Sequence, residues 1–135
     1  MAASIAGVFW QLVRLICECR RGALPRVCSY ANTLLELKRF EEAKAVTRKT
    51  IPVARRVLGE GDTITLRTRW NYARALYEDP AATLDDLHEA VTTLEEVERT
   101  ARRVLGGAHP LTPAFEDSLQ KARAALRARE TPSAR

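Results

Sequence analysis

The strongest constraint on the fold is a six-residue segment, Ala-Arg-Arg-Val-Leu-Gly, that occurs at residues 54–59 and again at 101–106. The copies lie 47 residues apart, and a period of about 20–50 residues is typical of stacked-repeat architectures. The similarity continues on both sides, since 40–43 matches 87–90 and 62–65 matches 109–112 at the same spacing. The chain is therefore predicted to use one structural unit about twice.

The spacing shortens further upstream, where the pattern Tyr-Ala-x-x-Leu at 30–34 returns after 42 residues at 72–76. Five extra residues must then lie in the second unit, and the segment Glu-Asp-Pro-Ala-Ala at 78–82 is the candidate. Doubling the length of a turn costs only about 0.6 kcal/mol of closure entropy. We expect the repeat to tolerate this insertion.

Apolar residues recur at steps of three and four through most of the chain, which predicts helices rather than strands. The predicted fold class is all-α, an α-solenoid of antiparallel helix pairs with terminal capping helices. Its expected parts are an N-terminal capping helix over 1–22, a first repeat over 24–64, a second repeat over 65–111, a C-terminal helix over 112–129 and a disordered tail over 130–135.

Several residues mark where these helices start, bend or end. Pro52 lies inside the pattern of the helix expected over 40–58, so a kink or a break is predicted near Thr50. Thr83 is the expected N-cap of the longest helix. Thr112 is the expected N-cap of the last helix, with Pro113 at its first position.

The most apolar stretch runs from Ile5 to Cys19 and has a helical periodicity. It is too short to span a membrane, and Arg14 and Glu18 interrupt it. A secretory signal would have a basic residue before its apolar core, whereas here the arginines follow it. We interpret the stretch as a helix covering the open end of the first repeat, with a targeting role as the alternative.

The cysteines and the charges limit which kinds of site and partner the chain can have. An odd number of cysteines, Cys17, Cys19 and Cys28, argues against a disulfide framework and for a reducing, cytoplasmic setting. A structural zinc site needs four ligands, so packed side chains are favoured and no metal or cofactor is expected. The net charge of +5 is concentrated in residues 1–56, which leaves a nucleic acid or an acidic membrane as an alternative, less favoured partner.

Segments of both units resemble the tetratricopeptide repeat, in the 42-residue form that is found in kinesin light chains. The matching segments are Asn-Tyr-Ala-Arg-Ala-Leu at 71–76, Phe-Glu-Glu-Ala at 40–43 and Leu-Gly-Gly-Ala-His-Pro-Leu-Thr at 105–112. The chain departs from that pattern at Lys38, where a turn glycine is usual, and it lacks the long heptad segment that joins kinesin light chains to the motor. The resemblance implies a concave surface that binds a peptide, and it does not extend to the motor role.

The expected peptide-binding residues lie on the first helix of each pair: Asn32, Arg67, Trp70, Arg74 and Tyr77. An aromatic ring between two guanidiniums suits an acidic ligand with an apolar anchor, although Trp70 could instead pack against the N-terminal helix.

Neither His88 nor His109 stands in a recognisable catalytic arrangement. The hypothesis is a non-enzymatic interaction module, and a fragment of a longer array that self-associates through its helix ends is a further alternative.

Overall fold

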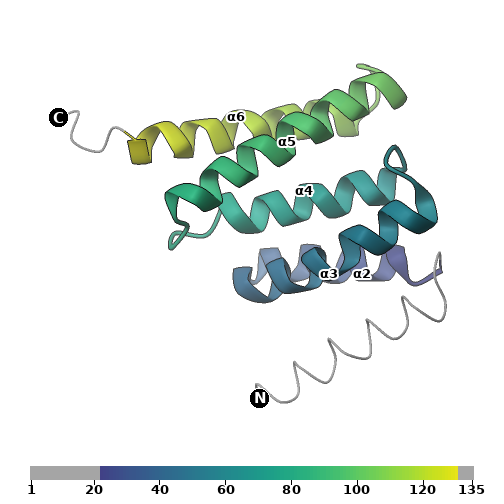
Figure 1. Ribbon diagram of the computed structural model, residues 1–135, viewed down its shortest axis with the longest axis horizontal. Helices are drawn as coiled ribbons and strands as arrows, with labels where there is room; N and C mark the ends of the chain where they lie inside the picture. The colour runs from purple at the N-terminus through teal and green to yellow at the C-terminus, as the bar shows by residue number, and fades with distance from the viewer. Residues whose placement is uncertain (1–21, 131–135) are drawn as a thin grey trace, which may run out of the picture.

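The computed structural model describes residues 22–130, which form five α-helices and contain no strand (Figure 1). The all-α prediction is therefore confirmed for this part of the chain. The helices are α2 (Leu24–Glu36), α3 (Phe40–Leu58), α4 (Thr63–Tyr77), α5 (Leu84–Val104) and α6 (Leu111–Glu130). The capping helix expected over 1–22 and the tail expected over 130–135 lie almost wholly outside the described residues.

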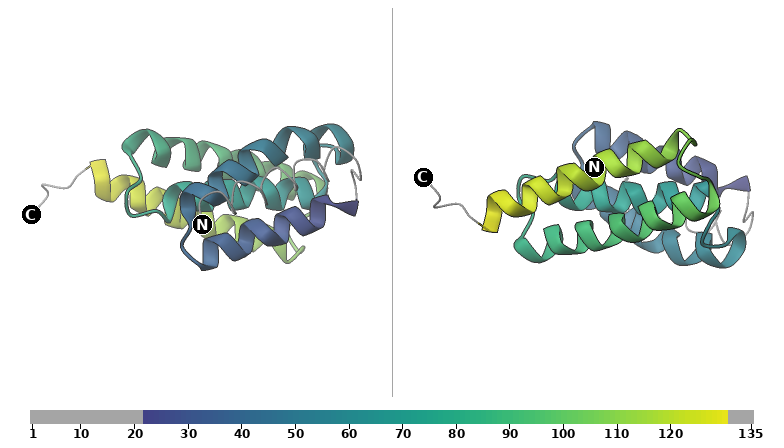
Figure 2. Two further views of the ribbon diagram at one scale, coloured as in Figure 1. Left: turned by 90° about the horizontal axis from the view of Figure 1, so that it is seen from below. Right: turned by 90° about the horizontal axis from the view of Figure 1, so that it is seen from above.

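The helices pack mainly against their neighbours in the sequence. α2 contacts α3 and α4, α4 also contacts α3 and α5, and α6 contacts α5 and, less extensively, α4. Figure 2 shows α3 and α5 on one side of the molecule and α2 and α6 on the other, with α4 between them. α2 and α6 therefore lie on the same side of the fold, and α4, the first helix of the second predicted unit, lies between that side and the side formed by α3 and α5.

Four alanines at matching positions of the two units are completely buried: Ala31, Ala43, Ala73 and Ala90. A methyl side chain allows two helix backbones to approach closely, and larger apolar residues fill the remaining space. Leu94 and Phe115 are also fully buried, and they belong to two neighbouring core clusters that join α4, α5 and α6. Apolar residues at helical spacing thus face the interior of the fold at these positions.

The turn between α2 and α3 contains an unusual backbone conformation. Lys38 has a φ of 62°, in the left-handed region that glycine adopts far more easily than other residues. At the ends of α3 and α5, Gly59 and Gly106 have φ values of 93° and 86°. The glycines of the duplicated hexapeptide thus occupy positions that require glycine, whereas the α2–α3 turn is made with lysine.

Two equivalent side chains begin α4 and α6. Asp62 Oδ1 accepts a hydrogen bond from the N–H of Ile64 at 2.9 Å, and His109 Nδ1 accepts one from the N–H of Leu111 at 3.1 Å. The prediction that Thr112 is the N-cap of α6 is wrong, because α6 already starts at Leu111. Thr112 is instead buried in the first turn, where its hydroxyl donates to the carbonyl oxygen of Gly106 at 2.8 Å.

Pro52 does not break α3, which runs without interruption from Phe40 to Leu58. Of the kink or break predicted near Thr50, the break is therefore absent. The hydroxyl of Thr50 donates to the carbonyl oxygen of Val46 at 2.7 Å. The predicted N-cap of α5 is confirmed, since Thr83 and Asp86 form a reciprocal capping box. Such a box satisfies two backbone donors at the start of the helix.

Candidate functional site

The predicted peptide-binding residues come from two helices that contact each other, and Arg74 lies at the centre of them. Arg74 Nη1 donates a hydrogen bond to Asn32 Oδ1 at 3.1 Å, which links α4 to α2. Its guanidinium also lies 5.4 Å from the centre of the Trp70 ring, and Arg74 Nε pairs with Glu78 Oε2 at 2.8 Å. The structure therefore brings Asn32, Trp70 and Arg74 together, with a carboxylate already bound to the arginine.

Trp70 is half-buried and packs against α6. Its ring meets Phe115 edge-on with 5.4 Å between the ring centres, and its indole N–H donates to Ser118 Oγ at 2.7 Å. A tryptophan between two guanidiniums was expected. Only one of the two guanidiniums, that of Arg74, lies over the Trp70 ring. Trp70 forms part of the α4–α6 junction as well as part of this surface.

Tyr77 and Arg67 lie at opposite ends of the same face of α4, because positions 67, 70, 74 and 77 follow the helical repeat. Burial raises the pKa of Tyr77, a hydrogen bond with Ser118 opposes this rise, and the hydroxyl stays protonated at neutral pH. Arg67 is exposed and makes no ion pair with any residue of 22–130. It is the one guanidinium of the predicted set that is free of a carboxylate within this range.

Lys121 on α6 is a further residue of this face that the prediction omitted. It lies 47 residues after Arg74, which itself lies 42 residues after Asn32, so the three occupy equivalent positions on α2, α4 and α6. Lys121 Nζ pairs with Asp117 Oδ2 at 3.0 Å, and 64% of its side chain is exposed. The internal repeat contained the signal for Lys121, because the same spacing that aligns the hexapeptides extends into α6.

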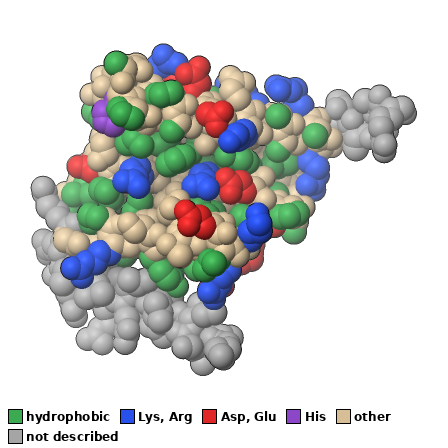
Figure 3. All heavy atoms as spheres, turned by 180° about the vertical axis from the view of Figure 1, so that it is seen from behind, with side chains coloured by type: hydrophobic (Ala, Val, Ile, Leu, Met, Phe, Trp, Pro, Cys, Tyr) green, Lys and Arg blue, Asp and Glu red, His purple; other side chains and the backbone are tan. Residues whose placement is uncertain are grey.

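We name this surface, formed by Asn32, Arg67, Trp70, Arg74, Tyr77 and Lys121, the first-helix face. Figure 3 views the molecule from behind, the side on which α2 and α6 lie in Figure 1, and shows basic, acidic and hydrophobic side chains interspersed there. Residues 22–130 as a whole carry 18 basic and 16 acidic residues. Such a mixed surface favours a ligand that combines charge and apolar contact over a uniformly charged one.

The cysteine of the described region is structural. Cys28 is a free, buried thiol, and burial raises its pKa, with a smaller opposing influence from Arg67. The side-chain amide of Asn71 donates to the carbonyl oxygen of Cys28 at 3.3 Å and thereby ties α4 to α2. Within residues 22–130 no group of three or more potential ligands is placed to hold a metal ion, and Cys17 and Cys19 lie outside that range.

The two histidines occupy ordinary surface and turn positions. His88 Nε2 lies 3.6 Å from Glu130 Oε2, and both side chains are about half exposed. His109 is used as the hydrogen-bond acceptor at the start of α6. Neither residue lies on the first-helix face.

Comparison of the chain with protein-family models, with curated proteins and with solved structures gives no match. Among the helices described, none combines the length and the apolar character that crossing a membrane requires.

Proposed function

We propose that the chain is a non-enzymatic interaction module in which two tetratricopeptide-like helix pairs and α6 hold an acidic segment of a partner protein on the first-helix face. The observation that carries the proposal is the row of Asn32, Arg74 and Lys121, which repeats one position on three helices. A peptide lying across those helices would meet one polar group at each step.

The side chains of the row suit carboxylates of the partner. Arginine binds a carboxylate through two parallel N–H donors, and Arg74 is already oriented by Asn32 and by the Trp70 ring. In the free protein the guanidinium of Arg74 is paired with Glu78. A partner carboxylate would therefore displace Glu78 or bind to the remaining N–H groups of the same guanidinium. Arg67, which pairs with no carboxylate of residues 22–130, supplies a second guanidinium.

Trp70 and Tyr77 add an apolar component to the surface. Because Trp70 is anchored by Phe115 and Ser118, it presents a preformed surface rather than a mobile side chain, which reduces the entropic cost of binding. We expect micromolar affinity for a short peptide, which corresponds to about −8 kcal/mol. A cytoplasmic setting belongs to the same proposal, because Cys28 is a free thiol.

The proposal is tested by reversing the charge at the centre of the row. Arg74→Glu should abolish binding of a library of acidic, tryptophan-containing peptides, measured by fluorescence anisotropy, because the carboxylate ligand would then meet a like charge. The matched control is Arg56→Glu, an exposed residue of α3 that is not part of the first-helix face, and this substitution should leave binding unchanged. Retained binding by Arg74→Glu would reject the first-helix face.

A milder variant and a salt titration complete the test. Arg74→Gln keeps a polar side chain beside Asn32 and should weaken binding while the circular dichroism spectrum stays that of the parent chain. Nucleic-acid binding falls by orders of magnitude between low and moderate salt, whereas a site supported by Trp70 and Tyr77 should weaken far less. Strong salt dependence together with equal weakening by Arg74→Glu and Arg56→Glu would favour the nucleic-acid alternative.

A further inference from the structure

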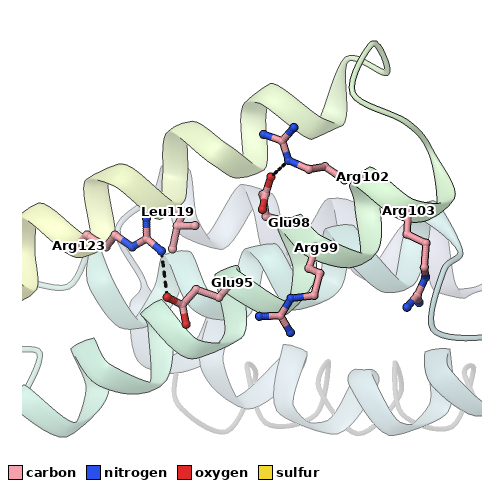
Figure 4. Close-up of a pocket in the computed structure, with 7 residues that line it drawn as sticks. All are labelled: Glu95, Glu98, Arg99, Arg102, Arg103, Leu119 and Arg123. Atoms are coloured by element: carbon pink, nitrogen blue, oxygen red, sulfur yellow. Dashed lines mark hydrogen bonds and ion pairs between the residues drawn. The ribbon is translucent and has the colours of Figure 1, made fainter.

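A hollow between α5 and α6 forms a second charged region, separate from the first-helix face. It has a volume of about 530 Å³, which is within the range of about 300–1,000 Å³ common for small-molecule sites. Its lining consists of Glu95, Glu98, Arg99, Arg102, Arg103, Leu119 and Arg123 (Figure 4). Four guanidiniums and two carboxylates therefore surround one hollow.

Ion pairs between the two helices fix the hollow at two places. Arg123 Nη2 of α6 lies 2.9 Å from Glu95 Oε2 of α5. Arg102 of α5 pairs with Glu98 of its own helix and reaches Glu116 of α6 at 3.1 Å. Leu119 is almost fully buried and belongs to the packed core between these pairs, so the part of α6 that lines the hollow is held in place.

Two of the four arginines pair with no carboxylate in the part of the chain that the structure describes. Arg99 and Arg103 are exposed and make no ion pair with any residue of 22–130, and neither of them meets a carboxylate in Figure 4. Both carboxylates of the lining are already paired with Arg102 and Arg123. An incoming anion can therefore attract the guanidiniums of Arg99 and Arg103 without breaking an ion pair among residues 22–130.

Helix-end electrostatics explain only part of this cluster. Cations are favourable in the last turn of a helix, and Arg102 and Arg103 lie in the last turn of α5. Arg99 lies one turn earlier, and Arg123 lies well inside α6. The internal repeat does not explain them either, since the residue 47 positions before Arg99 is Pro52 and the one before Arg123 is Leu76.

We propose that this hollow binds a small anion carrying two or more phosphate groups. Arginine is the side chain best suited to phosphate, because its planar fork matches two phosphate oxygens. With two carboxylates against four guanidiniums, the lining has a net charge of +2, which favours a multiply charged anion. Arg99 and Arg103 provide one guanidinium for each of two phosphate groups. Six of the seven lining residues are charged, so a charged ligand suits the hollow better than a mainly apolar one.

The test uses the whole chain and inorganic pyrophosphate as the probe, with isothermal titration calorimetry at low salt. The double variant Arg99→Ser/Arg103→Ser should raise the dissociation constant by at least about tenfold. The control Arg26→Ser/Arg56→Ser removes the same charge from exposed positions on α2 and α3 and should leave binding unchanged. Absence of binding by the parent chain, or equal weakening in both double variants, would overturn the proposal.

A second arm distinguishes a free phosphate compound from a phosphorylated lipid head group. Phosphatidylcholine vesicles with and without phosphatidylinositol bisphosphate are sedimented with the same proteins. Retention of the parent chain by the bisphosphate vesicles, and its loss in Arg99→Ser/Arg103→Ser, would support the site with a lipid as the source. Equal retention of that double variant would overturn it. Because the substitutions lie outside the first-helix face, binding of acidic peptides should persist in either case.

Discussion

At the residue scale, chemically different side chains at equivalent positions of the repeat make the same hydrogen bond at the start of a helix. Asp62 and His109 lie 47 residues apart, and each accepts a hydrogen bond from the backbone N–H two residues later. A carboxylate and a neutral imidazole can both do this, since each offers an acceptor. The turn position of Lys38 tolerates fewer residue types, because a side chain on a residue in the left-handed region crowds the backbone.

Lys38→Gly should therefore stabilise the protein. Relief of the left-handed conformation at a φ of 62° is worth about 1 kcal/mol, offset in part by the greater freedom of glycine in the unfolded chain. Urea denaturation followed by circular dichroism measures the change. The neighbouring Leu37→Gly is the control, because Leu37 has a φ of −83° and glycine there should only destabilise. A lower denaturation midpoint for Lys38→Gly would contradict the account.

At the element scale, α3 shows that packing can outweigh an unfavourable residue inside a helix. Pro52 lacks the N–H that would bond to the carbonyl oxygen of Arg48, yet the helix continues on both sides of it. Thr47 and Ala54 flank this point and are buried against the rest of the fold. The apolar contacts of α3 with α2 and α4 therefore hold a backbone that the isolated helix would not favour.

Pro52→Ala should raise the free energy of unfolding by about 1–3 kcal/mol, because it restores one helical hydrogen bond. Pro52 is exposed, so the substitution removes little packing. Pro113→Ala is the matched control: Pro113 is exposed in the first turn of α6, where a backbone N–H has no intrahelical partner. Thermal melting should show a gain for Pro52→Ala and almost none for Pro113→Ala. Equal effects of the two substitutions would contradict this interpretation.

At the scale of the whole molecule, contacts between neighbouring helices carry the stability. Polar links reinforce the apolar ones: Arg69 is 5% exposed and pairs with Glu96 of α5 at 2.5 Å and with Glu60 of the α3–α4 turn at 3.7 Å. α6, by contrast, carries no strongly exposed large hydrophobic side chain, and its Leu111 and Leu126 are partly buried. Self-association through α6 would therefore have little apolar surface to bury.

Leu94→Ala should destabilise the protein by about 2–4 kcal/mol, because Leu94 is fully buried between α4 and α6. Hydrogen exchange should show the largest loss of protection in α4, α5 and α6, and a smaller loss in α2 and α3, whose core cluster does not include Leu94. Val91 is only partly buried, and Val91→Ala should cost less. An unchanged melting curve for Leu94→Ala would contradict this assignment of the core.

The sequence alone determined the 47-residue repeat and the helical character of the chain, and it placed the helix over 40–58 and the N-cap Thr83 where the structure has them, because periodic apolar spacing and capping are local properties of the chain. It also placed Asn32 and Arg74 at equivalent positions. The start of α6 was predicted wrongly from local propensity at Thr112, and the break considered at Pro52 is absent, since hydrogen bonds and packing from elsewhere in the fold override such preferences.

Only the tertiary structure decided which charges are free and which are neutralised. Trp70 meets Phe115 and Ser118, which lie more than 40 residues away in the chain, and Arg123 meets Glu95 across two helices. Such contacts depend on the relative rotation and sliding of packed helices, which the periodicity of one helix does not encode. The hollow between α5 and α6 therefore became visible only once those helices were placed together.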